Sequence, residues 1–181
     1  EALAGKNVRL IAVTKKAAPS QMEEAFEQGV TEFGENRIQD ALDKREKLSP
    51  SLVQKANWHF IGHLQTNKVK FAIGNFSLIH SVDSLKLAKE ISRVAAKKGI
   101  TQAILLQVKV AKDPSKSGFS TEEILAQLGE IKSLPNLDLQ GLMTITPLTD
   151  DRKFRKQCFI DLKKLRDDLE AAYDVSLEEL S

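Results

Sequence analysis

Cysteine, tryptophan and tyrosine each occur only once in this sequence of 181 residues. The single cysteine, Cys158, excludes a disulfide within the chain and favours a cytoplasmic location. Cys158 falls on the apolar stripe of a predicted helix, so we interpret it as core packing and not as a nucleophile. Long apolar runs are also missing, and no stretch approaches the roughly 20 residues that a membrane helix needs.

The chain has little excess charge, because 27 Lys and Arg residues face 25 Asp and Glu residues and leave a net charge of +2. This balance gives no electrostatic basis for binding nucleic acid or a membrane surface. The length fits one domain, residues 1–181. Residues 1–5 do not resemble a signal peptide, and we expect them to belong to a leading helix. No long exposed apolar stripe is evident, which favours a monomer.

Short apolar runs alternate with helical patterns along the chain. The predicted strands are 9–15, 33–36, 58–62, 78–82, 104–110 and 139–145, and a seventh begins at 177–181. This alternation predicts an α/β fold with a parallel sheet, either a closed barrel or an open doubly wound sheet. No G-x-G-x-x-G follows the first strand, which weakens the dinucleotide-binding version of the open sheet. A closed (β/α)8 barrel of the TIM type needs eight strands, so we expect its last strands to be missing from this chain.

Several residues predict where the helices begin and end. Ser20 with Glu23, and Ser120 with Glu123, have the spacing of capping boxes. Ser84 or Asp83 is expected to cap a helix that ends near Gly99. The Ser49-Pro50 pair is expected to end the helix that precedes it.

Lys15 is the first candidate functional residue, because the run Arg9–Lys15 reads as a strand buried on both faces. On such a strand Ile11, Val13 and Lys15 share a face, and the amine stands at the carboxyl end, where α/β folds bind ligands. Burial and the charge of the neighbouring Lys16 both favour a neutral amine, which can form a Schiff base with a carbonyl group. The alternative is that the side chain simply extends into water, as most strand-ending lysines do.

Other residues offer competing chemistry. Lys109 is a rival amine, but it faces outward if Val108 and Val110 face inward. His59 and His63 are four residues apart, yet no further ligand stands nearby, so a zinc site is disfavoured. The loop around Ser117 and Gly118 lacks the leading glycine of a Walker motif, although these residues suit the rim of a site. A Schiff-base aldolase without a cofactor would use the same Lys15.

A set of motifs recurs in a distinctive order along the chain. They are Val13-Thr14-Lys15, Phe33-Gly34-Glu35-Asn36, Trp58 to Lys68, His80-Ser81-Val82-Asp83, Lys116-Ser117-Gly118 and Gly141-Leu142-Met143. Together they resemble the pyridoxal phosphate homeostasis protein family, the YggS-like proteins that bind pyridoxal 5′-phosphate (PLP), over essentially the whole chain. That family is similar in fold to the barrel domain of alanine racemase, called fold type III among PLP proteins.

The resemblance implies one PLP held as a Schiff base on Lys15, with no established catalytic turnover. It also implies a role in supplying or buffering PLP in the cytosol, with PLP-dependent apo-enzymes as candidate recipients. Asn36 would lie near the ring hydroxyl, and His80 and Met143 would flank the ring or its edge. The phosphate-binding segment of the family would follow Ser181.

The residues alone leave structural alternatives open for three of these positions. Asn36 suits a helix N-cap equally well. His80 suits a hydrogen-bonded core histidine, and Met143 suits plain core packing.

The main functional alternative is a fold-III PLP enzyme such as an amino-acid racemase. Racemisation with two bases needs an acid–base group on each face of the substrate carbanion. Lys15 can serve one face. By resemblance, fold-III racemases take the group for the other face, a tyrosine, from an extra domain of a partner subunit, whereas the only tyrosine here, Tyr173, lies at the far end of a helix. The sequence therefore favours a PLP carrier over a racemase.

Overall fold

A computed structural model describes residues 8–111 and 117–181 of the chain. The described residues form one sheet of seven parallel strands, whose spatial order β1 to β7 equals their order in the sequence. The strands are β1 (Ala12–Val13), β2 (Glu32–Glu35), β3 (Asn57–Phe60), β4 (Leu78–Val82), β5 (Gln102–Gln107), β6 (Leu137–Met143) and β7 (Glu179–Leu180). An order without reversal is that of a barrel and not of a doubly wound sheet. The sheet is the curved part of a (β/α)8 barrel, and the predicted fold class is confirmed.

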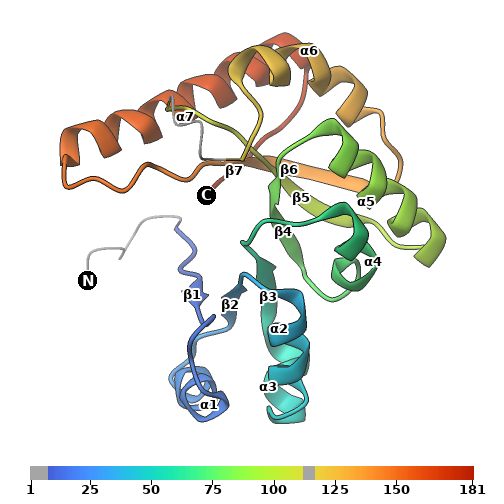
Figure 1. Ribbon diagram of the computed structural model, residues 1–181, viewed down its shortest axis with the longest axis vertical. Helices are drawn as coiled ribbons and strands as arrows, with labels where there is room; N and C mark the ends of the chain where they lie inside the picture. Colours follow the sequence, from blue (N-terminus) through green and yellow to red (C-terminus); the bar gives the residue numbers. More distant parts are fainter. Residues whose placement is uncertain (1–7, 112–116) are drawn as a thin grey trace.

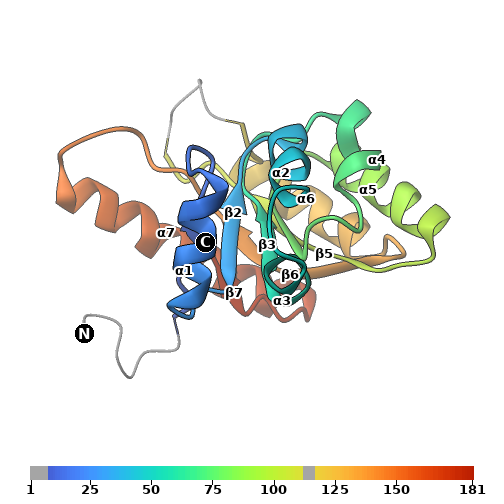
Figure 2. The same cartoon turned by 90° about the horizontal axis from the view of Figure 1, so that it is seen from below.

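Helices connect successive strands. They are α1 (Pro19–Glu27), α2 (Ile38–Arg45), α3 (Pro50–Lys55), the 3-10 helix η1 (Thr66–Lys68), α4 (Val69–Ala72), α5 (Leu85–Lys98), α6 (Thr121–Lys132) and α7 (Arg152–Tyr173). Figure 1 shows α1, α2 and α3 beside the first strands, and α6 and α7 at the opposite end of the sheet. The view from below separates α1 from the pair of α2 and α3 (Figure 2).

The two sides of the sheet differ in how they are packed. The large core joins alternate strand residues, such as Ile104 and Leu106, to the inner stripes of the helices. We call this the helix-facing side. The opposite side, here the concave side, carries a much smaller cluster of Leu78, Leu105 and Met143. This division follows from the alternation of side chains along each strand.

The prediction that residues 9–15 form a strand buried on both faces is wrong. Only Ala12 and Val13 pair with β2, and Val13 is 53% exposed. The reason is position, because β1 is an edge strand and the concave side is open beside it. Thr14 turns to the helix-facing side, and Lys15 lies in the turn that follows the strand.

The first capping box was also placed wrongly. Helix α1 begins one residue earlier, at Pro19, and the side chain of Gln21 accepts a hydrogen bond from the Ala18 N–H group. Glu23 instead accepts hydrogen bonds from Ser49 at the start of α3. Ser49 is the N-cap of α3, so the Ser49-Pro50 pair opens a helix that the sequence reading did not include.

The later helix signals are confirmed. Ser120 and Glu123 form a reciprocal capping box at α6. Ser84 caps α5, which ends at Gly99 in the left-handed conformation. The leading helix expected at residues 1–5 lies outside the described residues, as does Lys116. Within the described ranges, no helix has both the length and the apolar character needed to cross a membrane.

Candidate functional site

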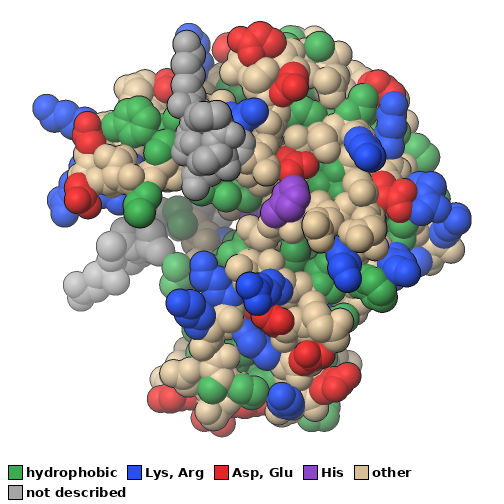
Figure 3. All heavy atoms as spheres, viewed as in Figure 1, with side chains coloured by type: hydrophobic (Ala, Val, Ile, Leu, Met, Phe, Trp, Pro, Cys, Tyr) green, Lys and Arg blue, Asp and Glu red, His purple; other side chains and the backbone are tan. Residues whose placement is uncertain are grey.

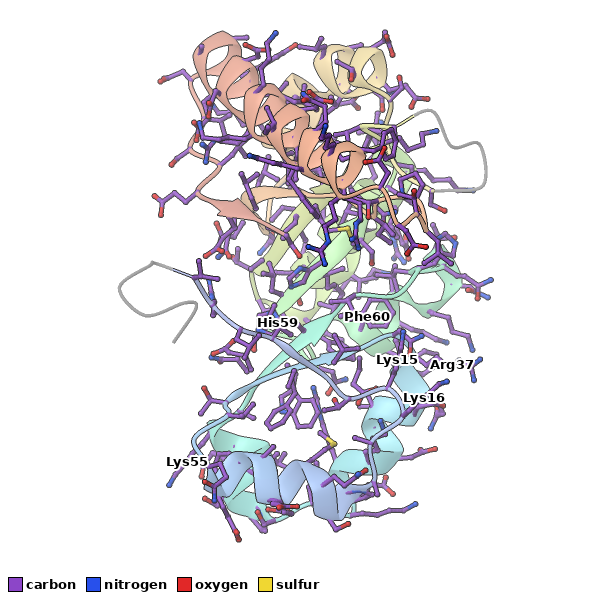
Figure 4. The ribbon with its side chains drawn as sticks, turned by 90° about the vertical axis from the view of Figure 1, so that its left-hand side faces the viewer. Lys15, Lys16, Arg37, Lys55, His59 and Phe60 are labelled. Carbon is purple, nitrogen blue, oxygen red and sulfur yellow. The ribbon has the colours of Figure 1, made fainter. Side chains whose placement is uncertain are left out.

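Lys15 follows β1 directly, at the carboxyl edge of the sheet (Figure 4). Its side chain is exposed, so the half-buried setting expected from the sequence is not found. No hydrogen bond or ion pair of its amine occurs within residues 8–111 and 117–181. The open concave side next to β1 explains this exposure. Lys15 therefore presents an unpaired primary amine at the edge where barrel folds bind ligands.

Thr14, the residue before Lys15, makes four hydrogen bonds through its three polar atoms. Its N–H donates to the Gly34 carbonyl (3.0 Å), and its hydroxyl donates to Glu35 Oε1 (2.8 Å). Its carbonyl oxygen accepts from the Ala17 N–H (2.9 Å) and from Lys44 Nζ (2.6 Å). The main chain that leads into Lys15 is thus fixed on every side.

Asn36 directly follows the neighbouring strand β2, in which Gly34 pairs with Val13 of β1. It is not the N-cap of α2, which is Arg37, so that alternative is wrong. A Cβ atom on Gly62 would come within 2.1 Å of the Asn36 carbonyl oxygen, so only glycine lets these two strand ends approach so closely.

Asn36 lines a hollow of about 250 Å³ between the start of α2 and the segment after β3. Arg37, Asp40 and Lys68 also line it, so its rim carries charges of both signs. In the space-filling view, basic side chains gather over the first strands (Figure 3). Lys15, Lys16 and Arg37 are exposed and lie near one another in Figure 4. Lys15 itself lines neither this hollow nor the one described next.

A second hollow, of about 430 Å³, opens on the concave side and is lined by His59, His80 and Leu105 among others. A row of hydrogen bonds runs along it. His59 Nε2 lies 2.7 Å from Glu32 Oε2, His59 Nδ1 lies 2.9 Å from His80 Nε2, and His80 Nδ1 lies 2.9 Å from Ser181 Oγ. The direction of one bond is fixed, because a carboxylate only accepts: His59 Nε2–H donates to Glu32.

The electrostatics of this row follow from burial and from its hydrogen bonds. Burial, followed by the charges of His59 and Arg9, lowers the pKa of His80 to about 3. Burial alone would raise the pKa of Glu32, but hydrogen bonds from Asn57 and His59 bring it below its ordinary value. His80 is thus a buried neutral imidazole whose two nitrogen atoms both have partners, as the structural alternative for this residue anticipated.

Met143 lies at the end of β6 on the concave side, packed with Leu78 and Leu105 and 4% exposed. The structure thus brings Lys15 and Asn36 together at the first two strand ends. His80 and Met143 share the concave side farther along the sheet. Whether these four residues contact PLP stays a prediction.

Sequence comparison adds an independent observation. The family described as "Alanine racemase, N-terminal domain" matches residues 1–181. The pyridoxal phosphate homeostasis protein of Synechocystis sp. is 42% identical over 175 residues, which cover 97% of this chain and 79% of the relative. That of Aquifex aeolicus is 38% identical over 178 residues, covering 98% and 77%. The chain belongs to the pyridoxal phosphate homeostasis protein family.

Solved structures agree with this membership. PipY of Synechococcus elongatus, determined with PLP bound, has a TM-score of 0.89 and 33% identity, covering 96% of this chain and 80% of that one. Alanine racemase of Clostridium difficile has a TM-score of 0.81 at 17% identity and covers 99% and 47%, so it shares the fold alone.

The tyrosine needed by the racemase alternative is engaged elsewhere. The hydroxyl of Tyr173 donates to the carbonyl of Leu125, which joins α7 to α6 far from Lys15. The rival amine Lys109 lies beyond the end of β5, while Val108 and Val110 pack into the helix-facing core as expected. His59 and His63 do not converge on a metal, since His59 faces Glu32 and His80 whereas His63 faces Asp83.

The sequence did not predict two clusters of hydrogen-bonded polar side chains. One joins Thr14, Glu35 and Lys44, and the other joins Glu32, His59 and His80. The available signal was the pair of glutamates in the otherwise apolar strand Glu32–Glu35, since a buried carboxylate requires partners.

Proposed function

We propose that this protein binds one PLP as a Schiff base on Lys15 and takes part in PLP homeostasis. The observation that carries the proposal is the unpaired amine of Lys15 at the carboxyl edge of the sheet. Family membership supports it, and so does the PLP bound to the related PipY. The other lysine near this strand end, Lys44, is paired with Glu35 at 2.7 Å and is mostly buried, so its amine is less accessible to an aldehyde.

The described residues fit this cofactor in a specific way. An aldehyde condenses with a neutral, accessible amine: the nitrogen lone pair attacks the carbonyl carbon, a C=N bond forms, and the oxygen leaves as water. Lys15 offers this amine on a main chain that is already fixed, with Asn36 beside it as a hydrogen-bonding group. His80 and Met143 would bound the ring from the concave side, and as a neutral imidazole His80 would add no charge there.

The finer features of the proposal are that the protein carries PLP without catalytic turnover, passes it to PLP-dependent apo-enzymes, and acts in the cytoplasm as a monomer. The engagement of Tyr173 away from Lys15 supports a carrier over a racemase. The lone buried Cys158 agrees with a reducing compartment.

The test is to add PLP, reduce with borohydride, and locate the modified lysine by mass spectrometry. Wild-type protein should carry the adduct on Lys15, and Lys15→Ala should lose it completely. Lys16→Ala and Lys109→Ala are the matched controls and should keep it. An adduct that survives in Lys15→Ala would move the site elsewhere.

The carrier role is tested separately. The PLP-loaded protein is incubated with L- and D-amino acids and their chirality is followed. Turnover of ~1 per second or faster, a rate typical of enzymes, would reject the carrier role.

A further inference from the structure

The hydrogen bonds around Thr14 converge from a buried ion pair on the helix-facing side. Glu35, in β2, is fully buried, and Lys44, in α2, is 15% exposed. Lys44 Nζ donates to Glu35 Oε1 (2.7 Å) and to the Thr14 carbonyl oxygen (2.6 Å). The same Glu35 oxygen accepts from the Thr14 hydroxyl (2.8 Å). One ammonium and one carboxylate thus hold the main-chain and side-chain oxygens of a single residue.

A second cation, Arg45, interacts with the Glu35 carboxylate. Arg45 lies one residue after Lys44, and its guanidinium stacks 4.1 Å from the centre of the Trp58 ring. Burial lowers the pKa of Arg45 to about 10, and the charge of Glu35 opposes this shift. Among the described residues, Glu35 Oε2 has no hydrogen-bond partner. The carboxylate therefore depends on these two cations and on Thr14.

Such an arrangement is a poor device for stability alone. The free-energy cost of removing two charges from water offsets much of their electrostatic attraction. Apolar residues of similar size often stabilise a fold as well or better. An ion pair does, however, provide directed hydrogen bonds, which apolar packing cannot. Here these bonds end on the peptide unit that leads directly into Lys15.

We infer that Glu35 and Lys44 are positioning residues that fix the main chain at Thr14 and thereby aim the Lys15 amine. The inference rests on the proposed function, because it explains why the main chain that leads into Lys15 is fixed. Lys15 is exposed and has a long side chain, so its own contacts do not order it. Fixing its Cα atom leaves only side-chain rotations to be restricted when an aldehyde arrives.

The experiment compares Lys44→Met, which keeps the length of the side chain and removes the charge, with Lys44→Arg, which restores a donor. Lys47→Met is the matched control, because Lys47 is exposed just beyond the end of α2. Two quantities are measured: amide hydrogen exchange at Ala17 without PLP, and the rate at which added PLP forms the borohydride-reducible adduct on Lys15. Circular dichroism shows whether each variant is folded.

We expect Lys44→Met to expose the Ala17 N–H to faster exchange and to slow adduct formation about ten- to a hundredfold. Lys44→Arg should restore most of the rate, and Lys47→Met should match wild type. If Lys44→Met does not fold, Thr14→Val removes one hydroxyl at constant shape and should slow the reaction by a smaller factor. Each of these results requires that the main chain be held from the helix-facing side.

The two ways of failing are distinct. Wild-type protein without an adduct on Lys15 would reject the proposed function, and this inference with it. An adduct that forms on Lys15 at the same rate in wild type and Lys44→Met, with unchanged exchange at Ala17, would overturn the positioning role and leave the proposed function intact.

Discussion

The two sides of the sheet both bury carboxylates, but they treat them differently. On the helix-facing side, Glu35 is paired with a lysine inside a continuous apolar core. On the concave side, Glu32 ends a row of two histidines that borders an open hollow. The helix-facing side therefore directs an ion pair at the main chain of Thr14, whereas the concave side joins its carboxylate to two imidazoles.

The strongest test of this contrast removes each carboxylate in turn. Glu35→Ala leaves the Lys44 ammonium without its partner in a mostly buried position, and should destabilise the fold by about 3–5 kcal/mol. Glu32→Ala leaves a neutral imidazole unpaired, and should cost about 1–2 kcal/mol. Urea denaturation of both variants measures the difference. Equal losses would mean that the two sides bury charge in the same way.

A smaller difference is expected between apolar neighbours on one strand. Ile104 and Leu105 are both buried, but Ile104 belongs to the helix-facing core and Leu105 borders the hollow of about 430 Å³. Ile104→Ala should cost about 4 kcal/mol because its cavity is closed on all sides, and Leu105→Ala about 2 kcal/mol. Thermal and urea unfolding of the two variants provide the comparison. A larger loss for Leu105→Ala would show that the concave side is the better packed one.

The smallest effect, taken over a single pH unit, is expected from acid and arises on the concave side. His80 binds its proton with a pKa of about 3 in the folded protein against 6.5 ordinarily, so between these values only the unfolded chain takes up the proton. Stability contributed by the neutral form is complete above pH 6.5 and is lost as the pH falls toward 3, by about 1 kcal/mol per pH unit.

His80→Asn should remove this part of the acid dependence, which urea titrations at several pH values would detect. The exposed His63 supplies the control, because His63→Asn should leave the slope unchanged. The same acid slope in His80→Asn and wild type would assign the proton uptake to another group.

Much of the fold could be predicted from the sequence. The strand Leu78–Val82 and the inner stripe of α5 followed from local patterns alone, because their apolar spacing matches the period of the element. The exposure of β1 could not be predicted, because its apolar run resembles that of a central strand. It is an edge strand within the seven strands that the structure describes. Helix α3 was missed because the Ser49-Pro50 pair was interpreted as a helix end, whereas Pro50 is the first residue of α3.

The candidate site divides in the same way. Lys15 could be found because a lysine at the end of an apolar run stands out. The role of Lys44 could not be predicted, because in the sequence it resembles any solvent-exposed lysine of a helix. Only the packing of α2 against the end of β1 shows that it binds the Thr14 carbonyl. Hydrogen bonds between residues 21 or 30 positions apart leave no periodic trace in the sequence.

The equality of strand order and chain order has a consequence for how the sheet assembles. Each strand pairs with the strand nearest to it along the chain, so every new ladder closes a short loop and the entropy cost of each step stays small. Contacts across the curve come at far greater separation, such as His80 with Ser181, 101 residues apart, and Arg9 with Glu179, 170 apart. Sheet growth is thus a local process that can start at any pair of neighbours, and only its final curvature requires distant parts of the chain to meet.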